Sequence, residues 1–138
     1  MISPSKEHFE EIGKQYTLYR TKFKEFVEAI LPLKDSIPSL EFGKVSDIQI
    51  EFNFLGNSYC IRHVYTITDD GMEESRLLGM SKAIDDDKYA EKTFGLLNET
   101  GWVSFPGDSP RDRLYISKDS SDRIFFKLIR GMFIHKNE

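Results

Sequence analysis

The sequence predicts an α+β fold in which an antiparallel β-meander packs against a long N-terminal helix and two further helices. Three patterns point to it: aromatic residues at helical spacing near the start, strict apolar alternation over residues 47–54, and an amphipathic stretch near the end. We expect the order α-β-β-β-α-β-β-α, in which three meander strands are followed by a short two-stranded hairpin. The length of 138 residues fits a single domain, 1–138.

Residues Ser3 to Leu31 are expected to form the long first helix. Ser3 and Pro4 suit the N-cap and the first helical position, and Pro32 ends the pattern. Seven apolar side chains recur at spacings of three or four residues and so share one stripe: Phe9, Ile12, Tyr16, Tyr19, Phe23, Phe26 and Ile30. We interpret this stripe as the surface that lies across the sheet; the alternative is a contact between two copies of the chain.

The next stretch is expected to form a loop and then a β-hairpin. Residues 33–44 contain one proline and one glycine and show no sustained period, which favours a connecting loop. Asp47–Phe54 alternates between apolar and polar residues, as is typical of a half-buried strand, and Tyr59–Thr68 follows as its partner. The dipeptide Gly56-Asn57 between them is predicted to form a two-residue turn.

That turn predicts a register between the two strands. Ile50 would face His63 on the inner side of the sheet, and Glu51 would pair with Arg62 on the outer side. After a second tight turn, Glu74–Lys82 is expected to form the third strand, whose register the sequence leaves open.

A second helix is predicted from Asp86 to Glu99. Asp85, Asp86 and Asp87 would cap its start and complement the helix dipole, and Gly101 lies near its end. Its inner side would carry Tyr89, Ala90, Thr93, Phe94 and Leu97.

The C-terminal part is expected to contain a short hairpin and the last helix. Trp102–Phe105 and Arg113–Ser117 are predicted strands, joined by an exposed, stiff loop with two prolines. Residues 119–122 would cap a helix that ends near Ile134; a strand over Arg123–Ile129 is the alternative. The apolar face of the helix would consist of Phe125, Leu128, Ile129, Met132 and Phe133.

Composition and motifs exclude several classes of function. With a net charge of -4, nucleic acid is not the expected partner, because phosphate affinity comes from clustered Lys and Arg. No stretch approaches the ~18 apolar residues of a membrane span, and the single cysteine, Cys60, cannot form an internal disulfide, so we expect a cytoplasmic protein without membrane contact. Neither a Walker loop nor a Gly-x-Gly-x-x-Gly motif occurs and the three histidines lie far apart, so no cofactor and no metal site is expected.

His63 is the polar residue of most interest, because the expected register places it on the inner face. We interpret it as a core histidine that hydrogen-bonds a neighbouring hydroxyl such as that of a tyrosine; the alternative is a general base in a cleft under the first helix. Glu51 and Arg62 would point to the other face and could not assist it. No catalytic residue is therefore assigned, and Cys60 is expected to be a small residue packed in a strand.

These patterns predict a non-enzymatic domain that binds another protein and occludes or escorts it. Acidic residues in turns would face a basic partner: Asp69, Asp70, Glu73, Glu74, Asp85, Asp86 and Asp87. The alternative is single-stranded nucleic-acid binding, with Phe52, Phe54, Tyr59 and Tyr65 as a stacking platform and arginines at the phosphates. These arginines are Arg62, Arg111, Arg113, Arg123 and Arg130.

The predicted element order and the small, acidic, cytosolic character resemble those of the small dimeric chaperones that escort type III secretion effectors, although the first helix here is much longer. The same outline resembles that of small bacterial immunity proteins, which neutralise a toxin by covering its active site. Both resemblances imply a protein partner, and neither assigns a site residue.

Overall fold

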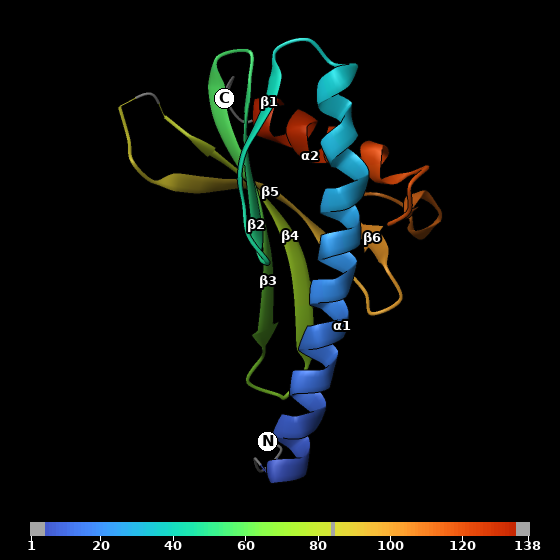
Figure 1. The fold of residues 1–138 in the computed structure, drawn as a ribbon. Helices are drawn as coiled ribbons and strands as arrows, with labels where there is room; N and C mark the ends of the chain where they lie inside the picture. Colours follow the sequence, from blue (N-terminus) through green and yellow to red (C-terminus); the bar gives the residue numbers. More distant parts are fainter. Residues whose placement is uncertain (1–4, 84, 135–138) are drawn as a thin grey trace.

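A computed structural model, which describes residues 5–83 and 85–134, shows a seven-stranded antiparallel sheet with two α-helices on one face (Figure 1). The strands lie side by side in chain order: β1 Leu40–Val45, β2 Gln49–Phe54, β3 Asn57–Ile67, β4 Glu73–Lys82, β5 Tyr89–Leu97, β6 Trp102–Ser104 and β7 Leu114–Tyr115. The α-helices are α1 Lys6–Ile30 and α2 Ser121–Ile134, and the 3₁₀ helices are η1 Leu31–Asp35 and η2 Pro110–Asp112. The predicted α+β class is confirmed, whereas the number and order of strands differ from the prediction.

The long first helix is confirmed, but only its C-terminal half packs in the core. Ser5 is the N-cap and its hydroxyl accepts a hydrogen bond from the His8 amide at 3.1 Å, while the predicted cap at Ser3 lies outside the described residues. The last four members of the aromatic stripe are buried: Tyr19, Phe23, Phe26 and Ile30. Phe9 is 60% exposed, and the start of α1 reaches past the β3–β4 turn (Figure 1).

The β2–β3 hairpin has the predicted faces but a different register. Its turn consists of Leu55 and Gly56, which have φ angles of 53° and 80°, instead of Gly56 and Asn57. Positive φ is uncommon for a large side chain such as leucine, so the sequence favoured the wrong pair of turn residues.

The shifted turn changes every cross-strand partner in this hairpin. Ile50 faces Ile61 instead of His63, and Glu51 faces Cys60 instead of Arg62. Arg62 lies opposite Gln49, whose side-chain oxygen accepts a hydrogen bond from Arg62 Nε at 2.8 Å. Because the register moves by two residues, the inner and outer faces stay as predicted.

The predicted helix over Asp86–Glu99 is wrong, because this segment contains β5. The spacing of its apolar residues fits a helix, but the segment pairs with β4 along the sheet and is therefore a strand. Gly95 conceals the alternation: it occupies an inward position where a Cβ would lie 2.8 Å from Val103 Cγ1. A side chain would not fit there, so the apolar signal of a strand is missing at this position.

The predicted loop over residues 33–44 is also wrong, because β1 begins at Leu40. Leu40 is buried and Phe42 packs on Phe52 with ring centroids 6.1 Å apart. The register between β1 and β2 shifts between Phe42 and Val45, which breaks the alternation that would have indicated a strand. The third strand, predicted from Glu74, is β4, and β6 and β7 form the predicted short hairpin.

The predicted C-terminal helix is confirmed as α2, and it packs closely on β4 and β5. Two glycines make this approach possible. A Cβ at Gly79 would lie 3.1 Å from Met132 Cε on α2, and a Cβ at Gly131 would lie 2.7 Å from Thr93 Oγ1 on β5. The apolar face of α2 completes a continuous core with α1 and the inner face of the sheet.

Candidate functional site

His63 lies in a closed aromatic cluster between β3 and α1. Its side chain is 3% exposed, and its ring centroid is 6.0 Å from that of Phe23 and 6.2 Å from that of Tyr16. The Nε2 atom lies 2.7 Å from Oγ of Ser75 on β4, which is also buried. The interpretation as a core histidine bonded to a hydroxyl is confirmed, with a serine as the partner.

The electrostatics of this cluster keep His63 neutral. Burial, together with a smaller effect of the nearby positive charge of Arg20, lowers the pKa of His63 from 6.5 to about 4. A neutral imidazole next to a serine hydroxyl has the elements of a nucleophilic pair, but both groups lie beneath α1 and a substrate would reach them only if α1 moved. Cys60 on the outer face is buried as well, and burial raises its pKa to about 12.

The seven predicted acidic residues divide into two groups at opposite ends of β4 (Figure 1). Asp69, Asp70, Glu73 and Glu74 lie at or next to the β3–β4 turn, and Asp85–Asp87 lie in the β4–β5 loop. The ten residues of β4 span roughly 30 Å between the groups. One flat partner surface would have to be large to contact both.

Several of these acids have local structural roles. Asp70 accepts a hydrogen bond from the Thr68 hydroxyl, which lowers the pKa of Asp70, and Glu74 forms an ion pair with Arg76. Asp86 accepts a hydrogen bond from the Lys88 amide at 3.0 Å. Their role in partner binding stays a prediction.

The elements of the nucleic-acid alternative are mostly dispersed. Phe52 and Tyr59 of the expected stacking platform are buried under α2, and Arg62 is bonded to Gln49 on the outer face. Arg111 and Arg113 do come together, in a shallow hollow beside Trp102 of β6.

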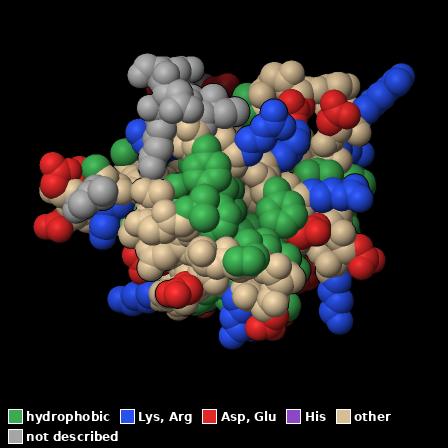
Figure 2. Space-filling view, turned by 90° about the horizontal axis from the view of Figure 1, so that it is seen from above, with side chains coloured by type: hydrophobic (Ala, Val, Ile, Leu, Met, Phe, Trp, Pro, Cys, Tyr) green, Lys and Arg blue, Asp and Glu red, His purple; other side chains and the backbone are tan. Residues whose placement is uncertain are grey.

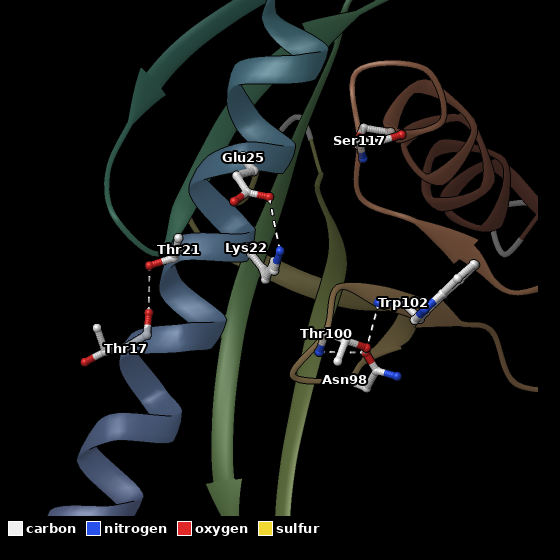
Figure 3. A network of polar contacts seen from close by, with 9 residues as sticks. Thr17, Thr21, Lys22, Glu25, Asn98, Thr100, Trp102 and Ser117 are labelled. Carbon is white, nitrogen blue, oxygen red and sulfur yellow. Dashed lines mark hydrogen bonds and ion pairs between the residues drawn. The ribbon is translucent and has the colours of Figure 1, made fainter.

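The position of Trp102 is fixed by the turn that precedes it, in which the Asn98 side chain accepts hydrogen bonds from the backbone. The Arg113 guanidinium carbon lies 4.4 Å from the centre of the Trp102 ring. The Asn98 side chain accepts hydrogen bonds from the amides of Thr100 and Trp102, and Figure 3 shows this turn beside Lys22 of α1. Trp102 is therefore fixed in position, with an arginine over its ring.

An open apolar groove lies where α2, the segment between η1 and β1, and the strands β1 and β2 meet, and sequence reasoning did not identify it. Its volume is about 240 Å³. We call it the apolar groove; it is lined by Ile37, Leu40, Phe54, Phe125, Phe126, Ile129, Arg130 and Phe133. Seven of these eight side chains are apolar, and Arg130 is the exception.

Aromatic side chains remain accessible in the apolar groove. Phe126 is 43% exposed, while Phe54 and Phe133 are half-buried and stack on each other with ring centroids 6.1 Å apart. Figure 2 looks onto this end of the molecule and shows apolar side chains gathered in its middle, with both basic and acidic side chains at the margin. The one sequence signal was Phe126, which lies off the buried stripe of α2.

A second groove separates α1 from the β1–β2 turn. It has a volume of about 580 Å³, and Phe23 and Val27 contribute to its wall. Arg20 and Asp47, on opposite sides, form an ion pair across it. Two of the charged groups that line this groove are therefore paired with each other.

Comparisons with protein-family models, curated proteins and solved structures find no match to this chain. In the part of the chain that the structure describes, no cluster of three or more His, Cys, Asp or Glu side chains is arranged to hold a metal ion. None of the helices formed by those residues has both the length and the apolar character needed to cross a membrane.

Proposed function

We propose that this chain is a non-enzymatic, cytoplasmic protein-binding domain that neutralises or escorts a partner protein, and that the partner contacts the apolar groove. The main support is the concentration of accessible aromatic side chains in this groove. A compact exposed apolar site with aromatic anchors is typical of the energetic centre of a protein interface.

The size of the apolar groove favours a protein over a small molecule. Small-molecule sites usually enclose roughly 300–1,000 Å³, whereas this groove has about 240 Å³. That volume suits one or two large side chains inserted from a partner surface. Phe126 and Phe133 would then contact them directly.

Position-specific crosslinking in the native host tests the proposal. A photo-crosslinking phenylalanine analogue is placed at Phe126 and, as the matched control, at Phe9, which is 60% exposed at the far end of α1. We expect one protein to crosslink from position 126 and not from position 9. Crosslinking of a partner from position 9 alone would contradict the proposal.

The captured partner then allows a quantitative test. Phe126→Asp should weaken its binding at least tenfold, because a charge would be buried against an apolar anchor. Phe9→Asp should change the affinity less than twofold. Thermal unfolding of both variants serves as the folding control, and equal affinities of Phe126→Asp and the unaltered chain would refute the assignment to the groove.

Single-stranded nucleic-acid binding is a second candidate, favoured by the arginine stacked on Trp102. Binding of a labelled oligonucleotide that falls steeply with salt and is lost in Arg111→Ala or Arg113→Ala would support it. An oligonucleotide that does not bind at low salt would dispose of it.

A further inference from the structure

Arg130 is placed to recognise a negative group beside the apolar groove. It follows Phe126 by one helical turn on α2, so the two side chains are neighbours on the helix surface. None of the ion pairs among the described residues includes Arg130. Lys127, one residue from Phe126, differs in this respect because it pairs with Asp108.

The charge of Arg130 also bears on which protein can dock. In a symmetric dimer through this groove, the same patch would face itself, and both copies of Arg130 would be enclosed in one contact. Like charges in a partly desolvated contact are unfavourable, whereas an arginine and a carboxylate form a strong, directional pair. A partner carrying an acidic residue is therefore favoured over a second copy of the chain.

We infer that the occupant of the apolar groove is a short segment of the partner protein that carries a large apolar side chain beside an Asp or Glu. The apolar side chain inserts between Phe54, Phe126 and Phe133, and Arg130 binds the carboxylate. This inference rests on the proposed function and specifies the chemistry of the partner at the same site.

Selection from a library of displayed random peptides tests this preference directly. The immobilised full chain is compared with three variants: Arg130→Glu, Phe126→Asp and the matched control Arg123→Glu. Arg123 is also an exposed arginine on α2, but it does not line the groove. Enriched peptides are synthesised with the acidic residue and with its amide, and their affinities are measured by calorimetry.

We expect the unaltered chain and Arg123→Glu to enrich peptides with an aromatic or large aliphatic residue near an Asp or Glu. Changing that acid to its amide should weaken binding at least tenfold. Arg130→Glu should lose the acidic preference and select Lys or Arg instead, and Phe126→Asp should enrich no such peptides.

The possible failures are distinguishable. Phe126-dependent binding that is indifferent to Arg130 would overturn the inference and leave the proposed function standing. Selection unaffected by Phe126→Asp, together with crosslinking only from position 9, would overturn both. Two further results would overturn the inference by identifying another occupant: self-association in sedimentation that Phe126→Asp abolishes, or tight binding of decanoate that depends on Phe126.

Discussion

The two α-helices cover the same face of the sheet, but α1 encloses the side chains beneath it whereas α2 leaves apolar side chains exposed at its side. The C-terminal half of α1 closes over its part of the sheet, where Phe23 is 1% exposed and His63 is 3% exposed. By contrast, α2 buries Phe125 completely and leaves its neighbour Phe126 43% exposed beside the apolar groove. An amphipathic helix in the sequence thus indicates that it covers one face of the sheet. Which of its apolar side chains stay accessible depends on the strands and loops that pack beside the helix.

The largest difference between these regions should appear in a pair of adjacent phenylalanines. Phe125 packs on Phe52 with ring centroids 5.1 Å apart and is fully buried. Phe125→Ala should lower the free energy of unfolding by about 3–5 kcal/mol because it leaves a cavity. Phe126→Ala should lower it by less than about 1 kcal/mol. Urea denaturation measures both, and equal losses would mean that Phe126 belongs to the core.

The closed region should make the protein sensitive to acid. Folding lowers the pKa of His63 from 6.5 to about 4, so the unfolded chain binds this proton more strongly. The contribution to stability is complete above pH 6.5 and is lost as the pH falls toward 4. Its full size is roughly 3 kcal/mol.

Comparing His63→Gln with the unaltered chain isolates this contribution. The free energy of unfolding is measured for both proteins from pH 7 to about pH 4. The charge of Arg20 and the rings of Tyr16 and Tyr19 surround position 63 and are present in both proteins. The variant should show a flatter decline whatever its stability at neutral pH. Two parallel profiles would show that His63 is accessible to water in the folded chain.

Replacing each of two helical glycines with alanine should change the stability of the chain in opposite directions. Gly131→Ala should destabilise the chain by about 1–3 kcal/mol, because the new Cβ would overlap with Thr93. Gly13 has no heavy atom within 4 Å of its Cβ position, so Gly13→Ala should stabilise the chain by up to about 1 kcal/mol. Thermal unfolding distinguishes the two, and stabilisation by both would mean that α2 lies farther from β5.

The smallest effect is expected in the β4–β5 loop. Asp85, Asp86 and Asp87 are exposed, and replacing all three with Asn should change the free energy of unfolding by no more than about 0.5 kcal/mol. The same variant tests the predicted role of these acids in binding. If they contact a basic partner, its affinity should fall and lose part of its salt dependence.

Sequence reasoning succeeded where one periodic pattern dominates a segment. The spacing from Tyr19 to Ile30 predicted a helix on the sheet, and the alternation of Ile50 and Phe52 predicted an inner strand face. Both patterns reflect burial of one face, and the structure buries that face in each case.

It failed where glycine or an unusual turn obscured the pattern. Gly95 occupies an inward strand position without contributing an apolar side chain, which favours a helix in the place of β5. The register shift between Phe42 and Val45 hides the alternation of β1, which favours a loop there. Leu55 adopts a positive φ, so the hairpin turn lies one residue earlier than predicted. The apolar groove could not be predicted, because Ile37 and Phe126 come from distant segments that only the fold brings together.

Hydrogen–deuterium exchange of the chain, with and without the partner identified by crosslinking, tests most directly whether the partner binds at the apolar groove. Partner binding should slow amide exchange in α2 and near Ile37, and leave exchange around Tyr16 and Tyr65 unchanged. Slower exchange along the first half of α1 and the β3–β4 turn, with α2 unaffected, would contradict the assignment.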